Sequence, residues 1–296
     1  MKRGANVKYL FIGLVIVAGL FGSVFLWERQ FWFIQEVQQQ RAQREMAENI
    51  SKFFQQRIEM SEKLEEDKED IDLFKYLEVM DSCGPYFEEE CLYVRAGPEM
   101  DESVVVRLRN GQVLKIGKRL ERDDEVWYKV EFDEWLLYPE RLRGDWYVSG
   151  DGVRTFWDRG PKVEHENFSK ENNKRIEVNL SEQRLYAYEG DELFMSGKIS
   201  GGLASTPTPR GEFRVFKKTP TRYMQGPIPG VTSRYWDFPG VPWNLYFTYQ
   251  GAIIHGTYWH DNFGIPQSAG CVNMSTDQAK ELYHWAPLGT KVTVFY

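Results

Sequence analysis

The sequence predicts a mainly β fold with one helix near its C-terminal end, preceded by a helical N-terminal segment. In residues 77–150, and again from residue 174 onward, short apolar or alternating stretches are separated by Gly, Asn and Asp turns, as in β-strands. One stretch, residues 274–287, instead has the apolar spacing of an amphipathic helix. The first 76 residues contain an apolar run and then a polar segment that lacks Gly and Pro from residue 28 to 75.

The composition is that of a folded protein with room for two domains of ordinary size. Of the 296 residues, 42% are hydrophobic and 15% are aromatic, which is enough to build cores and excludes wholesale disorder. The formal net charge is −7, so the chain is not expected to be a general binder of nucleic acid. No cofactor is expected either.

Residues 1–27 are predicted to be a cytoplasmic tip and a transmembrane anchor. The 19 residues that end at Trp27 carry no charge and nearly match the roughly 20 needed for a helix to cross a bilayer. A cleaved signal peptide is the alternative, but its apolar core is typically only about 7–15 residues long. Lys2, Arg3 and Lys8 stand on the short N-terminal side, which places that side in the cytoplasm. The rest of the chain is then expected on the periplasmic or cell-wall side of the cell membrane, held by a single span.

Residues 28–76 are predicted to form a helical stalk. The segment is rich in Gln, Glu, Lys and Arg, and its apolar residues recur at helical intervals, for example at Phe31, Ile34 and Val37. Such a helix can pair with a second copy through its apolar side. Self-association through the stalk is therefore one expectation, and a plain solvated spacer is the other.

The three cysteines of the chain fall into two groups. Cys83 and Cys91 enclose seven residues, and outside the cytoplasm they can close a small disulfide loop. Two free thiols are the alternative. Cys271 is left without a partner, and a lone cysteine outside the cytoplasm is a candidate reactive thiol.

Residues 77–150 are predicted to be a small β domain. The stretches "LYVRAGPEMDESVVVRLRNGQVLKI" and "WYKVEF" have the pattern of strands, and "RNGQ" is a strong signal for a hairpin. Together these stretches resemble a bacterial SH3-like domain, a small β-barrel. The resemblance implies binding of peptides or peptidoglycan, and a purely structural spacer is the alternative. Residues 151–173 are polar with scattered aromatics and are expected to be a linker.

Residues 174–296 are predicted to be the second domain, in which strands resume. Residues 219–243 are dominated by Pro, Gly and aromatic residues. This stretch is too long for a tight turn, so we expect a lid or flap over a site. The helix that follows later is expected to begin at Ser275 or Thr276 as N-cap, with the acidic Asp277 in its first turn.

Cys271 and His255 are the candidate catalytic residues. A nucleophilic cysteine needs a lowered pKa and a base within hydrogen-bond reach. Cys271 comes just before the predicted helix cap, where helix N-terminal amides and the helix dipole favour a thiolate. His255 ends the apolar run "GAII", which is typical of a buried strand. A zinc site made by His255, His260 and Cys271 is the competing interpretation, and it is disfavoured because no second cysteine is near.

Several separate motifs in residues 175–296 resemble the L,D-transpeptidase catalytic domain, the YkuD family. They read "RLYAYEGDELFMSGKISGG", "STPTPRGEFRV", "VPWNLYF", "IHGTYWHDNFG" and "SAGCVNMS". The resemblance implies a β-sandwich-like domain that transfers acyl groups between peptidoglycan stem peptides. Cys271 would attack the carbonyl between the third residue, a diamino acid, and the fourth, D-alanine. His255 would be its base, oriented through the backbone of Gly256. The side-chain amine of another stem's third residue would then resolve the thioester into a 3→3 cross-link.

The same motifs hold further residues that we assign to the site. Gly270 and Ser268 are expected to stabilise the oxyanion or to orient the catalytic loop. Four residues are expected to contact the substrate: Tyr258, Trp259, Asn273 and Arg210.

The family pattern Ser/Thr-His-Gly-Cys is not fully kept in this chain. Ala269 stands where the family has its second histidine, whereas the upstream His255 is retained. His260, in the same loop as His255, is a candidate substitute for the lost imidazole. An active transpeptidase is the main expectation. The alternatives are an L,D-carboxypeptidase, in which water resolves the thioester, and a catalytically weak peptidoglycan-binding protein.

Overall fold

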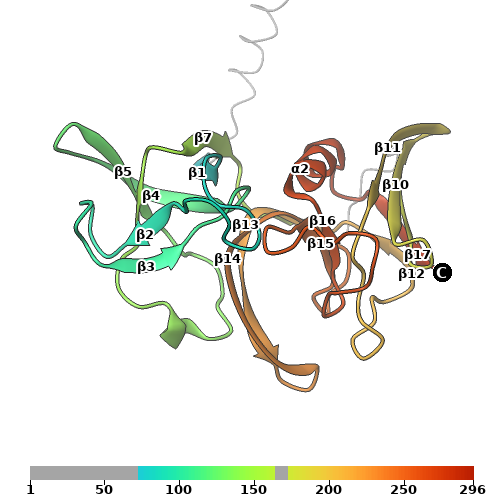
Figure 1. Ribbon diagram of the computed structural model, residues 1–296. Helices are drawn as coiled ribbons and strands as arrows, with labels where there is room; N and C mark the ends of the chain where they lie inside the picture. Colours follow the sequence, from blue (N-terminus) through green and yellow to red (C-terminus); the bar gives the residue numbers. More distant parts are fainter. Residues whose placement is uncertain (1–72, 164–172) are drawn as a thin grey trace, which may run out of the picture. The chain divides into compact units, whose positions relative to one another are not determined.

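The computed structural model describes residues 73–163 and 173–296 of the chain (Figure 1). The predicted membrane anchor, residues 1–27, and all but the last residues of the predicted stalk, 28–76, lie outside the described residues. Within the two described ranges, no helix is long and apolar enough to cross a membrane. The described residues belong to a single compact unit.

A seven-stranded antiparallel sheet forms the N-terminal part of the described chain. Its strand order is β3-β2-β6-β5-β4-β1-β7. The elements are β1 (Phe74–Val79), β2 (Tyr93–Arg95), β3 (Val104–Arg107), β4 (Val113–Arg122), β5 (Glu125–Val130), the 3₁₀ helix η1 (Pro139–Arg141), β6 (Tyr147–Ser149) and β7 (Val153–Asp158). Its core contains Leu77, Val94, Leu114 and Trp146. The resemblance of this part to an SH3-like domain stays a prediction.

Two five-stranded sheets and one α-helix form the C-terminal part. One sheet has the order β11-β10-β9-β17-β12 and the other the order β16-β15-β14-β13-β8. The elements are β8 (Lys162–Val163), β9 (Lys174–Asn179), β10 (Arg184–Glu189), β11 (Glu192–Lys198), β12 (Gly211–Arg214), β13 (Lys217–Ile228), β14 (Thr232–Tyr246), β15 (Ile253–Gly256), β16 (Val272–Met274), α2 (Thr276–Trp285) and β17 (Lys291–Phe295). Both sheets and α2 contribute to one core, for example through Leu185, Leu245 and Leu282. The predicted mainly β fold is therefore confirmed for the described residues.

Helix α2 is fixed at both ends by side chains. Ser275 is its N-cap and accepts a hydrogen bond from the backbone of Gln278, as one of the two predicted caps requires. At the other end, Lys218 Nζ donates to the carbonyl oxygens of Tyr283 and Ala286, at 2.5 and 2.6 Å. A cation there complements the negative end of the helix dipole. Burial lowers the pKa of Lys218 to about 8.

The segment expected to be a linker, residues 151–173, contributes a strand to the first sheet. All six residues of β7 pair antiparallel with β1. The ring of Phe156 on β7 stacks on Tyr76 of β1, with centroids 5.6 Å apart, and also lies 5.3 Å from the ring of Trp243. These buried ring contacts explain why β7 belongs to the sheet although its sequence is polar. The C-terminal boundary of the predicted stalk, residue 76, is also wrong, because residues 74–76 are the first residues of β1.

The predicted hairpin at "RNGQ" forms a turn, but its flanking strands do not pair with each other. The backbone of Gln112 donates to Arg109 O at 3.3 Å, and Gly111 has a φ of 83°, which favours glycine. However, β3 pairs with β2, and β4 pairs with β1 and β5. The turn is instead fixed to β14, because Gln112 Nε2 donates to Pro239 O at 2.8 Å.

The predicted division into separate domains at residues 77–150 and 174–296 is not seen in the core. Tyr76 and Val113 of the first sheet belong to the same buried cluster as the C-terminal sheets. Glu78, which is 4% exposed, accepts hydrogen bonds from Arg154 at 2.6 Å and from Lys280 of α2 at 2.5 Å. The two parts therefore share buried surface and a buried ionic contact.

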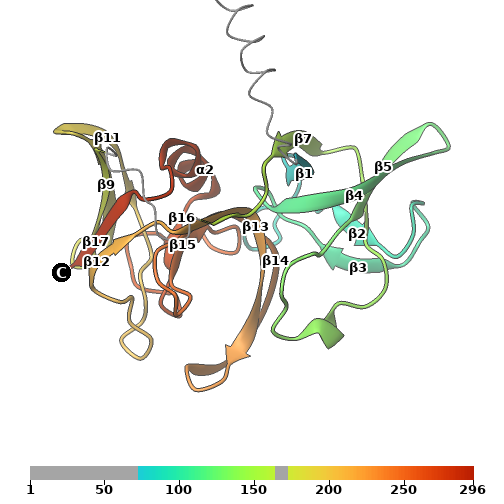
Figure 2. The same ribbon diagram turned by 180° about the vertical axis from the view of Figure 1, so that it is seen from behind.

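The segment predicted as a lid, residues 219–243, forms most of a long hairpin made by β13 and β14. The two strands pair from Lys217 and Tyr246 to Ile228 and Thr232. In both views the hairpin extends beyond the other strands of its sheet (Figures 1 and 2). Its base adjoins β15, the strand that carries His255. Closure of this hairpin over a site stays a prediction.

Candidate active site

The two candidate catalytic residues lie on adjacent strands. Strands β15 and β16 pair in parallel, with Ile254 opposite Val272 and His255 opposite Asn273. Cys271 immediately precedes β16, so it lies beside Ile253. Because successive side chains of a strand alternate between faces, Cys271 and His255 point to the same face of the sheet.

His255 is held as a neutral base whose side chain interacts with Gly256 and Asn273. Its side chain is buried, and Nδ1 lies 2.9 Å from Gly256 O. Since a carbonyl oxygen only accepts, Nδ1 carries the proton and Nε2 is left as the acceptor. Burial lowers the pKa of His255 to about 4, and the positive charge of Arg222 acts in the same direction. The ring of Trp259, 5.7 Å away, covers part of the imidazole.

Cys271 is held as a neutral thiol. Burial raises its pKa, and a backbone hydrogen bond from Ile253 and the charge of Arg222 only partly offset that effect. Its Sγ lies 3.9 Å from Gly251 O. The predicted stabilisation of a thiolate by a helix N-terminus is not found, because β16 separates Cys271 from α2 and the helix begins at Thr276. The resting pair is thus thiol and imidazole, and the proton must move when a substrate arrives.

Ser268 braces the loop that carries the cysteine. Its Oγ donates to Cys271 O at 2.6 Å and accepts from the backbone N–H of Gly270 at 3.1 Å. Gly270 has a φ of 113°, a conformation that side chains rarely adopt. Its N–H is therefore engaged within the loop. To stabilise an oxyanion, the N–H of Gly270 would have to break its hydrogen bond to Ser268 Oγ and donate to the substrate oxygen instead.

Asn273 lies in the interior of the site, where it contacts His260. Its side chain is 3% exposed, and Asn273 Nδ2 lies 3.2 Å from His260 Nε2. Burial lowers the pKa of His260. Ala269, by contrast, is exposed. His260 and residue 269 therefore occupy different environments, one inside the loop and one at its surface.

The remaining predicted substrate residues are spread over a wider area. Tyr258 is buried and donates to Pro239 O at 2.7 Å, and Trp259 stacks on Phe238 with ring centroids 4.0 Å apart. Both rings thus form the wall beside His255. Arg210 is exposed and its guanidinium lies 4.6 Å from the ring centre of the C-terminal tyrosine. None of its described interactions reaches the cysteine–histidine pair.

Two residues of the site were not singled out from the sequence. Thr208 Oγ1 lies 3.5 Å from Cys271 O and accepts from the backbone of Gly202 at 2.8 Å, so it ties the "STPTPRG" motif to the cysteine loop. Arg222 on β13 places a positive charge near both catalytic groups. Thr208 could have been found from the sequence, because it lies within the motif "STPTPRG". Arg222 could not, because nothing in its sequence context distinguishes it from any other cation in an aromatic stretch.

The described residues contain no group of three or more His, Cys, Asp or Glu side chains arranged to hold a metal ion. His255 directs Nδ1 at a backbone carbonyl, and His260 faces Asn273. The imidazoles therefore have polar neighbours other than a metal, and the zinc interpretation gains no support from their geometry.

The C-terminal part of the chain is similar to proteins of known family. Residues 173–294 match the family model of YkuD, the L,D-transpeptidase catalytic domain. This match agrees with the resemblance of residues 175–296 to that family.

The chain is similar to curated relatives over about two fifths of its length. It is 32% identical over 123 residues to a Bacillus licheniformis protein named as a putative L,D-transpeptidase YkuD. The aligned region covers 40% of this chain and 64% of the relative. It is 30% identical over 138 residues to an Escherichia coli K12 protein named as a probable L,D-transpeptidase ErfK/SrfK. Here the aligned region covers 41% of this chain and 44% of the relative. A crystal structure of a mutant Enterococcus faecium L,D-transpeptidase has 27% identity and a TM-score of 0.38, over 42% of this chain and 50% of that one. The chain thus spans less than two thirds of the relatives that it matches.

Proposed function

We propose that the protein is a membrane-anchored peptidoglycan L,D-transpeptidase that forms 3→3 cross-links through a cysteine acyl-enzyme. The observation that carries the proposal is the pairing of β15 with β16, which sets a neutral histidine, whose Nδ1 is engaged by Gly256 O, on the same face as the free thiol. The YkuD match of the surrounding residues supports the same chemistry. The anchor is proposed from the apolar run that ends at Trp27.

In the first half-reaction, Cys271 Sγ attacks the carbonyl carbon between the third stem residue and D-alanine. The thiol proton passes to His255 Nε2, and the imidazolium that forms keeps its Nδ1–H bond to Gly256 O. His255 then returns that proton to the leaving amine of D-alanine. A thioester remains on Cys271.

In the second half-reaction, the side-chain amine of another stem's third residue attacks the thioester. His255 Nε2 accepts a proton from the amine and delivers it to the departing sulfur, so Cys271 is restored as a thiol. The product is an amide between two third residues. Water in place of the amine gives hydrolysis, the L,D-carboxypeptidase alternative.

The exposed position of Ala269 bears on the alternative of a weak wall-binding protein. The cysteine loop is braced by Ser268 and Thr208, which both direct a hydroxyl at Cys271 O. The loop therefore has internal support that does not use the side chain at position 269. This observation favours an active enzyme over an inactive relative.

Incubation of the purified chain with a stem tetrapeptide tests the proposal. We expect a mass increase on Cys271, release of D-alanine, and a cross-linked dimer once an acceptor stem is added. Cys271→Ala should abolish adduct and release, and His255→Ala should nearly do so, with the double variant little worse than either single one. D-alanine release by Cys271→Ala would rule the mechanism out, and release without dimer would favour the carboxypeptidase.

A further inference from the structure

A cavity lies beside the loop that follows His255, and we call it the basic groove. It has a volume of about 620 Å³ and runs along β2 and β3 to the edge of β14. Its charged and aromatic lining consists of Arg95, Arg107, Arg109, Asp237, Phe87, Tyr93 and Tyr258. Tyr258 is the third residue after His255, so the groove adjoins the loop of the candidate active site.

The three guanidinium groups of the basic groove form no close ion pair with the described residues, although the charge of Glu88 partly offsets that of Arg109. Among the described residues, no carboxylate lies within ion-pairing distance of any of them. Arg95 donates to the backbone carbonyl of Glu102 at 2.7 Å, and Arg109 donates to that of Pro85 at 3.2 Å. Carbonyl oxygens satisfy a hydrogen bond but leave the positive charge in place.

The one carboxylate that lines the basic groove is already committed elsewhere. Asp237 accepts hydrogen bonds from Tyr223 OH at 3.1 Å and from Gln225 Nε2 at 3.3 Å, and it lies 3.9 Å from Arg141. Asp237 therefore does not balance the three arginines. The groove keeps an excess of positive charge that attracts anions.

Arg109 also has an unused donor. Its guanidinium lies between two rings, 4.0 Å from the centre of Phe87 and 5.2 Å from the centre of Tyr258. Its Nε is buried without a hydrogen-bond partner in the described residues. A buried donor left unpaired costs free energy, so such groups usually have a partner in the functional state.

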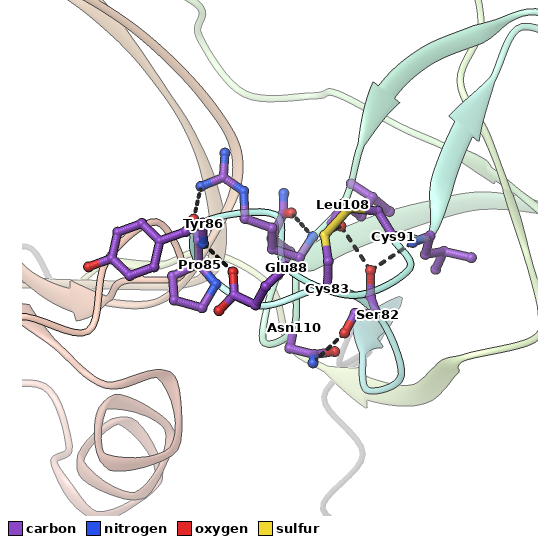
Figure 3. The surroundings of a disulfide bond; sticks show 11 residues. Ser82, Cys83, Pro85, Tyr86, Glu88, Cys91, Leu108 and Asn110 are labelled. Atoms are coloured by element: carbon purple, nitrogen blue, oxygen red, sulfur yellow. Dashed lines mark hydrogen bonds between the residues drawn. A yellow bond between two sulfur atoms is a disulfide. The ribbon is translucent and has the colours of Figure 1, made fainter.

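The disulfide loop, residues 83–91, contributes Phe87 to the lining of the basic groove, and Figure 3 shows the surroundings of its disulfide. Cys83 and Cys91 are joined there, and Phe87 lies 4.0 Å from the guanidinium of Arg107 as well. Tyr86 in the same loop donates to Asp261 Oδ1 at 2.8 Å, on the segment that follows His260. The groove is thus lined in part by a covalently closed loop that also contacts the catalytic loop.

We propose that the basic groove binds an acidic peptide, whose carboxylates are held by the arginine forks. This proposal rests on the proposed function, because it takes the acidic peptide to be a peptidoglycan stem peptide bound next to the active site. Val104 and Val105, 50% and 40% exposed, give the groove an apolar side. Peptide side chains can cover this apolar side, whereas a phosphodiester polymer cannot, so the peptide is favoured.

Calorimetric titration of the full chain carrying Cys271→Ala tests binding apart from chemistry. The probes are a stem tetrapeptide with free carboxylates and the same peptide with its carboxylates amidated. We expect Arg107→Gln and Arg95→Gln each to weaken binding of the free-carboxylate peptide about tenfold, as loss of a charge-assisted hydrogen bond predicts. Arg119→Gln, on β4 outside the groove, is the matched control and should bind as the unaltered chain does.

The ligand comparison decides the outcome. Amidation should weaken binding to the unaltered groove about tenfold or more and should have a smaller effect in Arg107→Gln, where Arg95 and Arg109 remain. Equal affinity of Arg107→Gln and the Arg119→Gln control, with both folded by circular dichroism, overturns the proposal. Tighter binding of a glycerol-phosphate oligomer than of the peptide also overturns it, in favour of a phosphate polymer. Because the assay needs no turnover, a failure of the proposed transpeptidase reaction would be seen separately, as absent acylation of the natural Cys271.

Discussion

Raising the pH of the free protein should reveal a neutral thiol at Cys271. Burial raises the pKa of this thiol above its ordinary value of 9.0 and lowers the pKa of His255 to about 4. At pH 7 both shifts favour the neutral forms, a thiol and an imidazole. A thiolate–imidazolium pair would instead hold the thiol pKa as low as about 3–4, and Cys271 would be fully ionised.

Alkylation by iodoacetamide measures this difference, because the thiolate is the reactive form. Cys83 and Cys91 are joined in a disulfide and Cys271 is free, so a single label reports on the site. We expect the rate to rise with pH to a midpoint above about 9, and the rate at pH 7 to lie about 100-fold or more below its plateau.

His255→Ala is the control for this titration. In a neutral pair the variant keeps a high alkylation midpoint, yet it loses acylation by peptide, since the base acts only when substrate is bound. A midpoint below pH 7 in the natural chain, shifted upward by about two units or more in His255→Ala, would refute the neutral pair. The resting site would then be a thiolate–imidazolium pair.

Three further outcomes follow from the same contacts. His255 has a folded-state pKa of about 4 against 6.5 in the unfolded chain, so its contribution to stability is present above pH 6.5 and is lost as the pH falls through 4. The free energy of unfolding should therefore drop between pH 7 and 4 by about 3 kcal/mol more in the natural chain than in His255→Gln, and equal drops in urea titrations would contradict this. Ser268→Ala removes two loop hydrogen bonds and should cost about 1–3 kcal/mol and slow acylation, whereas Ser268→Thr should retain both properties; a wild-type rate in Ser268→Ala would count against the brace. His260→Ala should slow acylation roughly tenfold both in the natural chain and in Ala269→His, because His260 is buried and residue 269 is exposed; a much larger loss in the natural chain would mean that His260 replaces the family's second histidine.

Local patterns in the sequence were sufficient for much of the C-terminal part. The apolar spacing predicts α2. Ser275 is its N-cap, because its hydroxyl accepts a hydrogen bond from the backbone of Gln278. The link between Cys271 and His255 came from motifs, since the two residues are distant in sequence and only the β15–β16 pairing makes them neighbours. The assignment of residues 173–294 to the YkuD domain agrees with those motifs.

Long-range partners account for what the sequence did not predict. β7 is stabilised by β1, whose residues come about 80 positions earlier, and no local signal shows that Phe156 will meet Tyr76. The prediction that a helix N-terminus adjoins Cys271 was wrong for a related reason. It assumed that Cys271 reaches the helix end, but the parallel partner β15 draws the next residues into β16 and delays the helix to Thr276.

The contacts that Glu78 and Phe156 make with Lys280 and Trp243 set where the protein can be cut. A fragment that begins at residue 173 would keep the whole YkuD match, yet Lys280 would lose its carboxylate and Trp243 would lose the ring of Phe156. Lys280 would then be solvated, but the apolar surface of Trp243 that Phe156 covers would be exposed to water, which is destabilising. Truncation or exchange of modules between related enzymes should therefore carry residues 73–158 together with the catalytic domain, as a single inherited piece.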